Sequence, residues 1–342
     1  MLNINMLLSI AQKGISFILV FGLLVFVHEL GHFLMARFNG VHVYEFAIGM
    51  GKKVFSYQGK ETIYSLRLFP IGGFVNMMGE DEESDDPGSF SSKKPIQRFS
   101  VLFAGPFMNF LLALLIFIIF FSVVGVPVNT VGNVLEDYPA AQAGLQAGDE
   151  IIQIESAEIT SWNEVTQNIA LHKDNSFSLI FIREGQEMTV EVTTLMSNEG
   201  RQIIGIEPMI VRKPGVVVTQ SFDTLNFMLK SIFGAFGNLV KGKSSGDEFV
   251  GPVGIINIVG ETSEYGIIPL LHLTAILSIN LGFINLLPFP ALDGGRLVFV
   301  LYEMIFRKPF NQEKEQSLHY IGFIMLLVLM VFLVTRDIIN FR

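Results

Sequence analysis

The sequence contains no cysteine and little charge. None of its 342 residues is Cys, and only 16% are Asp, Glu, Lys or Arg. The lack of cysteine excludes disulfide bonds and cysteine-ligated metals, so any metal has to be bound by histidine, aspartate or glutamate. The net charge of −9 argues against a nucleic-acid partner, which normally requires a basic surface. Half of the residues are hydrophobic and the mean hydropathy is +0.50, a composition typical of proteins with several membrane spans.

Four apolar segments are long enough to cross a bilayer. They cover residues 6–38, 99–124, 267–287 and 318–334. A hydrocarbon core of roughly 30 Å needs about 20 helical residues. The first segment lacks the charged head and cleavage site of a secretory signal and exceeds the length of a signal core, so we expect it to be retained. The sequence therefore predicts a polytopic α-helical membrane protein with four transmembrane helices.

Basic residues gather in two of the three connections between these segments. The first connection contains Arg37, Lys52, Lys53, Lys60, Arg67, Lys93, Lys94 and Arg98, and the third contains Arg296, Arg307, Lys308 and Lys314. The positive-inside rule places both connections in the cytoplasm. The acidic cluster at residues 80–86 does not change this, because acidic residues contribute little to the rule. The polar insert of residues 127–212 is then expected outside.

Two stretches predict β-structure. Residues 62–69 (T-I-Y-S-L-R-L-F) alternate as a strand does, and Gly-rich segments precede and follow them. We expect a membrane-associated β-hairpin within residues 41–98, although a hairpin without a functional role is also consistent with the pattern. In the insert, residues 177–182 and 188–192 flank an E-G-Q turn and predict a second hairpin.

Residues 213–266 follow the insert and contain an amphipathic pattern. Apolar residues recur at helical spacing: Phe222, Leu225, Leu229, Ile232, Phe233, Phe236 and Val240. This pattern predicts a helix lying at the outer membrane surface. Packing of the same helix against the outer domain would produce the same pattern.

The strongest chemical signal is an H-E-x-x-H motif at residues 28–32. Positions four apart share one face of a helix, so His28 and His32 can bind one cation, with Glu29 beside them as a general base. A chain of this length shows the motif by chance on the order of 1% of the time. The motif lies about fifteen residues, or roughly 22 Å, past Lys13 in an apolar helix. Ionisable groups at such depth are costly and usually functional; the alternative is a helix that reaches the cytoplasm early, with both histidines solvated.

A zinc site with an open position for water needs a third protein ligand. Asp293 is the best candidate, because it follows N-L-L-P-F-P-A-L (residues 285–292) and precedes Gly294 and Gly295, where prolines and glycines break a helix near membrane depth. Irregular backbone is tolerated there only when it is buried or lines a cavity. Four histidines are less suitably placed: His42, His172, His272 and His319. The alternative for Asp293 is a loop residue that caps the next helix.

Three motifs together resemble the site-2 protease family of intramembrane zinc metalloproteases, and more narrowly its bacterial regulator-of-sigma-E protease type. They are H-E-L-G-H-F, A-G-P-F-M-N-F (residues 104–110) and the L-D-G-G that follows N-L-L-P. The resemblance covers nearly the whole chain, including G-P-V-G-I at residues 251–255. It implies that Zn²⁺ is bound by His28, His32 and Asp293, with Glu29 as the catalytic base. Asn285 would contact the substrate or the oxyanion.

The resemblance also implies how a substrate is held. The P-I-G-G-F-V segment, with Gly72, Gly73 and Phe74, matches the family's membrane-associated hairpin, which pairs with an unwound substrate strand. Residues 139–152 resemble the family's PDZ signature, followed by E-S-A where an Asn-Gly turn is common. There is room for one PDZ domain. The predicted division is 1–40 (first span), 41–98 (hairpin), 99–126 (second span), 127–212 (PDZ domain), 213–266 (interfacial segment) and 267–342 (third and fourth spans).

The expected activity is hydrolysis of peptide bonds in or near transmembrane segments. The resemblance implies single-span membrane proteins as substrates, such as anti-sigma-factor-like regulators or remnant signal peptides, in regulated intramembrane proteolysis. It places the protein in a bacterial cytoplasmic (inner) membrane, in contact with the lipid bilayer. Two other classes stay open: a non-catalytic scaffold that presents a PDZ domain, and a transporter. A transporter predicts repeated halves, which the sequence does not show.

Overall fold

The computed structural model describes residues 4–80, 84–172, 176–197, 200–243, 250–308 and 310–340. The chain divides into two compact units. One comprises Met1–Phe117 and Phe222–Arg342, and the other comprises Ile118–Ser221. Each unit is described by itself. Part of the acidic cluster, residues 81–83, and residues 244–249 of the expected interfacial segment lie outside the described residues.

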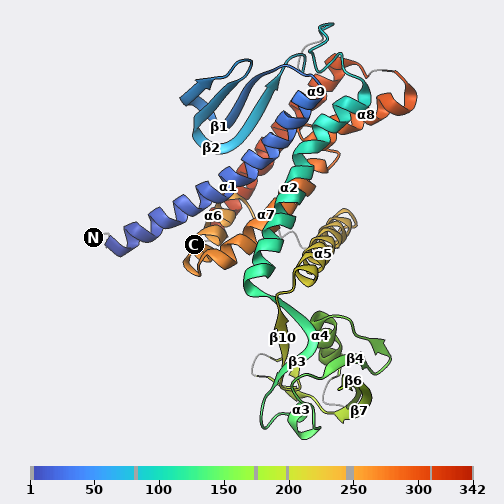
Figure 1. Cartoon of the computed structure of the whole chain (residues 1–342). Coiled ribbons are helices and arrows are strands. Elements are labelled where there is room, and N and C mark those ends of the chain that lie inside the picture. Colours follow the sequence, from blue (N-terminus) through green and yellow to red (C-terminus); the bar gives the residue numbers. More distant parts are fainter. Residues whose placement is uncertain are drawn as a thin grey trace. The chain divides into compact units, whose positions relative to one another are not determined.

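Each of the four apolar segments is a helix. The helices are α1 (Ile4–Phe38), α2 (Pro95–Val124), α7 (Ile267–Leu286) and α9 (Gln312–Asn340). All four are long and apolar enough to cross a membrane. Two further helices, α5 (Pro214–Val240) and α6 (Pro252–Glu264), occupy the expected amphipathic segment (Figure 1).

Helix α6 packs against α1 and α9 in the first unit. Val259 is fully buried in a cluster with Val20 and Leu24 of α1. The N-terminus of α6 receives a buried carboxylate, because the backbone N–H groups of Gly251 and Gly254 donate to Asp337 of α9 at 3.2 and 2.8 Å. A side chain at either glycine would collide with a neighbour, which explains the G-P-V-G motif.

The predicted hairpin is present and is longer than the strand pattern indicated. Strand β1 (Val43–Gln58) pairs antiparallel with β2 (Ile63–Met77), which continues through the P-I-G-G-F-V segment (Figure 1). Residues 45–48 of β1 pair with residues 63–66 on one side and with residues 73–76 on the other. Within the described residues, 73–76 therefore form an outer edge of the sheet, and β2 lies against α1.

A buried glutamate, Glu45, links residues of both strands of the hairpin. Glu45 accepts hydrogen bonds from Ser65 and Arg67 and pairs with Lys53 at 3.0 Å. Burial alone would raise the pKa of the Glu45 carboxyl, but these three partners stabilise its charged form and lower the pKa to about 2.

An additional helix follows the break after α7. Residues 287–292 are irregular, and α8 then spans Asp293–Phe306. Gly294 and Gly295 thus belong to the first turn of α8, whereas the sequence pattern predicted that they break a helix. They are required for close packing: a Cβ at Gly295 would lie 2.9 Å from the carbonyl carbon of Phe289, and one at Gly294 would collide with the backbone of Leu286.

The second unit contains a sheet with strand order β10-β3-β4-β6-β7. Its strands are β3 (Val126–Val134), β4 (Glu150–Ile154), β6 (Phe177–Arg183), β7 (Gln186–Val192) and β10 (Ile206–Val211). The unit also contains two helices, α3 (Pro139–Gln142) and α4 (Trp162–Leu171). Its remaining strands are short: β5 (Ala157–Glu158), β8 (Leu195–Met196) and β9 (Gln202–Ile203). The hairpin around E-G-Q is confirmed as β6–β7.

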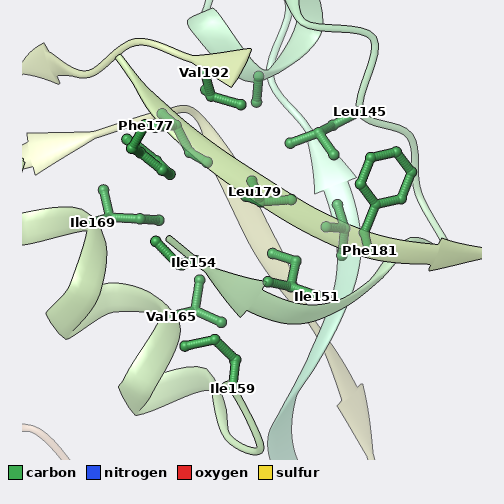
Figure 2. Packing of buried hydrophobic residues seen from close by; sticks show 13 residues of the cluster. Leu145, Ile151, Ile154, Ile159, Val165, Ile169, Phe177, Leu179, Phe181 and Val192 are labelled. Carbon is green, nitrogen blue, oxygen red and sulfur yellow. The ribbon is translucent and has the colours of Figure 1, made fainter. Parts of the chain in front are cut away.

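The core of this unit lies between α4 and the sheet. Figure 2 shows Val165 and Ile169 of α4 beside Ile154 of β4, with Leu179 of β6 in the same cluster. The G-D-E sequence at residues 148–150 also has a structural role. Buried Asp149 accepts hydrogen bonds from Arg183 Nε and Nη2 at 2.7 and 2.8 Å, which fixes the turn before β4.

Candidate metal centre

Two helices bring three ligand atoms to one point. His28 Nε2 and His32 Nε2 lie 3.3 Å apart on α1, one helical turn from each other. Asp293 Oδ2, at the start of α8, lies 3.2 Å from the first nitrogen and 3.3 Å from the second. All three atoms are within 4.8 Å of one another. The structure therefore unites the motif with the aspartate that sequence analysis selected.

The donor set fits a zinc ion. His28 and His32 are 8% and 7% exposed, and the buried Oδ2 of Asp293 receives no hydrogen bond from the described residues. Lone pairs converging in a buried site repel each other unless a cation lies between them. Two imidazole nitrogens and one carboxylate oxygen, with space for water, are a typical ligand set of catalytic zinc.

Contacts to α2 define the protonation of His32. Its Nδ1 lies 2.9 Å from the carbonyl oxygen of Val101, which can only accept a hydrogen bond. A neutral ring must therefore carry its proton at Nδ1, and in that tautomer the Nε2 lone pair is directed at the cluster. The helices approach closely here because both contribute glycine. A Cβ at Gly31 would lie 2.7 Å from the carbonyl carbon of Ala104, and one at Gly105 would lie 2.6 Å from His32 Cε1.

The break after α7 positions Asp293. Ala291 adopts a left-handed conformation with φ +77°, which is strained for a residue with a side chain. Its N–H donates to His319 Nδ1 of α9 at 2.9 Å. Helix α9 also packs tightly on this loop, since a Cβ at Gly322 would lie 2.6 Å from the carbonyl carbon of Pro290. Helix α9 thus holds the loop that delivers the carboxylate.

Glu29 lines a small cavity of about 160 Å³ together with the three ligand residues. Gly73 and Phe74 of β2 line the same cavity. A Cβ at Gly73 would lie 2.9 Å from Glu29 Cγ, so the strand approaches this carboxylate only because residue 73 is glycine. The cavity thus joins an acid, a candidate metal site and a sheet edge.

A larger polar cavity of about 750 Å³ adjoins the small one. The two share Glu80, Leu102, Asp293 and Arg296. Glu80 and Arg296 form an ion pair at this boundary, and Arg98 pairs with Glu303 further along. Charged walls next to the ligand cluster can hold the water that a hydrolytic reaction consumes.

Two predicted site residues lie apart from the cluster. Asn285, near the end of α7, is half-buried and is not among the described residues that line either cavity. Gly72 precedes Gly73 in β2 with φ +78° and is not among the described residues that line the small cavity; a Cβ there would lie 2.8 Å from Met50 Cε. Glu80, Arg296 and Asn109 were not among the predicted site residues, although a lone asparagine in an uncharged span is itself a functional signal.

Known proteins resemble nearly the whole chain. The profile of peptidase family M50 matches residues 16–329. A protein of Clostridium perfringens named as a zinc metalloprotease is 40% identical over 325 residues, covering 94% of this chain and 97% of the relative. One of Clostridium acetobutylicum, named likewise, is 38% identical over 328 residues, covering 94% and 96%. Zinc metalloprotease RasP of Bacillus licheniformis is 34% identical over 413 residues, covering 95% and 98%.

Solved structures resemble one part of the chain. The PDZ domain of the SdrC-like protein from Listeria monocytogenes is 25% identical, covering 25% of this chain and 87% of that structure with a TM-score of 0.22. The PDZ domain of the SdrC-like protein from Listeria innocua is 26% identical, covering 25% and 96% with a TM-score of 0.23.

Proposed function

The chain belongs to peptidase family M50 and is a zinc metalloprotease, and on this premise we propose that His28, His32 and Asp293 bind its zinc while Glu29 acts as the general base. The observation that carries this proposal is the convergence of the three ligand atoms within 4.8 Å beside Glu29. Most of the chain separates Asp293 from the two histidines in sequence, so it is the tertiary fold that brings the three ligand atoms together.

The residues around the cavity suit peptide hydrolysis. When bound, zinc polarises the scissile carbonyl group and lowers the pKa of a water molecule. Glu29 would take the proton of the attacking water and pass it to the leaving nitrogen. The tautomer of His32, set by Val101, keeps its Nε2 available as a ligand. The adjoining polar cavity is the proposed route by which water arrives.

We propose that the substrate binds as a strand along residues 73–76. A helical substrate hides its amide groups, so it has to be extended before a peptide bond can be attacked, and an edge strand stabilises the extended form. Gly73 and Phe74 line the cavity that contains Glu29, which supports this placement. Gly72 would shape the same edge. Asn285 is a proposed substrate or oxyanion contact on the strength of its N-L-L-P motif alone.

The proposed setting is a bacterial inner membrane. The four apolar helices and the basic connections support an active site toward the cytoplasmic side of the membrane, with residues 127–212 as an extracytoplasmic PDZ domain. Proposed substrates are single-span membrane proteins, such as anti-sigma-factor-like regulators or remnant signal peptides, cleaved in or near their transmembrane segments during regulated intramembrane proteolysis.

A cleavage assay in lipid vesicles tests the proposal. Purified protein is incubated with a panel of single-span substrates, and zinc is measured in the same samples. Glu29→Gln should retain zinc and lose cleavage, whereas His28→Ala should lose both. Full cleavage by Glu29→Gln would contradict the role of Glu29. A folded wild-type protein that binds no zinc and cleaves nothing would favour the scaffold.

A further inference from the structure

Asn109 of α2 contacts the ligand His28 from the side opposite the metal cluster. It is fully buried in an apolar helix, and its carboxamide nitrogen lies 3.1 Å from His28 Nδ1. Its backbone carbonyl separately accepts a hydrogen bond from Ser278 Oγ of α7 at 2.7 Å. Neither end of the carboxamide has another hydrogen-bond partner among the described residues. The contact with His28 therefore decides how this side chain is oriented.

The chemistry of the ring selects one orientation. If the carboxamide NH₂ donated to Nδ1, a neutral His28 would carry its proton at Nε2, directed at His32 and Asp293, and could not bind a metal there. The oxygen and nitrogen of an asparagine side chain are interchangeable by rotation. With the oxygen turned to His28, it accepts the Nδ1–H, and the Nε2 lone pair points into the cluster.

We propose that Asn109 is a positioning residue that fixes the tautomer and ring plane of His28 through its side-chain oxygen. This inference rests on the proposed metal centre. It makes α2 the orienting element of both histidines, because Val101 does the same for His32. The A-G-P-F-M-N segment then has two functions one helical turn apart: Gly105 permits the close approach of α2 to His32, and Asn109 reaches His28.

The test measures zinc release from the full-length protein in detergent. Zinc transfer to a chromogenic chelator is followed for wild type, Asn109→Leu, Asn109→Asp and Ser278→Ala. Loss of an outer hydrogen-bond partner typically weakens metal binding about 10–100-fold, so Asn109→Leu should release zinc faster by that factor. Asn109→Asp should release zinc no faster than wild type, because a carboxylate can only accept and keeps the Nδ1–H bond. Ser278→Ala is the matched control, since it removes the bond to the backbone of residue 109 and leaves the carboxamide in place.

Two outcomes would overturn the inference. One is release from Asn109→Leu at the wild-type rate. The other is an Asn109→Asp variant that folds and releases zinc as fast as Asn109→Leu, which would mean that the NH₂ group matters. Thermal unfolding of the metal-free variants shows whether each variant folds. If the leucine side chain prevents folding, Asn109→Ala replaces Asn109→Leu. If His28→Ala still binds zinc, the proposed metal centre itself is contradicted. If His28→Ala loses zinc while Asn109→Leu binds zinc as wild type does, only this inference is contradicted.

Discussion

Gly105→Ala should disrupt the metal centre while sparing the fold. The added Cβ would lie 2.6 Å from His32 Cε1 and 2.7 Å from Cδ2, and closer still to Nε2, whereas ordinary contacts begin at 3.4 Å. Either the ring or the helix must move by at least about 0.8 Å. Metal–ligand distances tolerate deviations of only about 0.2 Å. Overpacking of this kind costs about 1–3 kcal/mol, which a membrane helix bundle can survive although the zinc site cannot.

The assay for this variant combines bound zinc, cleavage and thermal unfolding in detergent. Gly105→Ala should purify folded, with a lowered melting temperature, little zinc and no cleavage. Gly22→Ala on α1 is the matched control, because a Cβ there meets nothing within 4 Å. It should keep zinc and activity. Wild-type zinc content and activity in Gly105→Ala would refute the close packing of α2 against His32.

Three further changes probe other parts of the account. Gly73→Val should keep zinc but lower cleavage at least tenfold, because its side chain would crowd Glu29 and the sheet edge; unchanged cleavage would remove the edge from the substrate site. The charged Glu45 carboxylate should stabilise the hairpin fully above its unfolded pKa of 4.5, and this stabilisation should be lost as the pH falls toward 2. After correction for intrinsic exchange rates, the backbone amides of the hairpin should therefore exchange hydrogen faster at pH 3 than at pH 5. Glu45→Gln should abolish this difference. Asp337→Ala should destabilise the protein by about 1–3 kcal/mol in reversible unfolding, since it leaves two buried N–H groups of α6 unpaired; an unchanged stability would contradict that capping.

Local sequence patterns were sufficient to predict the four spans, the histidine pair and the E-G-Q hairpin. The spans follow from apolar runs alone, and the face shared by His28 and His32 follows from the helical repeat. The E-G-Q hairpin follows from turn chemistry. In each case the deciding residues lie within a few positions of one another.

Features that depend on distant contacts were missed. Helix α8 was overlooked because Gly294 and Gly295 disfavour a helix, and only their packing against the preceding loop explains them. The alternating pattern of residues 62–69 did not extend to the second half of β2, which only the family resemblance assigned to the hairpin, because that half pairs with residues 45–48, far back along the chain. The partner of Asn109 could not be read from α2, since nothing in that helix indicates that it faces His28.

The most direct test of the central claim is X-ray absorption at the zinc edge of purified protein. The account predicts two imidazole nitrogens and one carboxylate oxygen at about 2.0–2.2 Å, with the carboxylate contribution lost in Asp293→Ala. One imidazole should disappear in His28→Ala if any zinc remains. An identical spectrum for wild type and Asp293→Ala, at equal zinc content, would contradict the proposed centre.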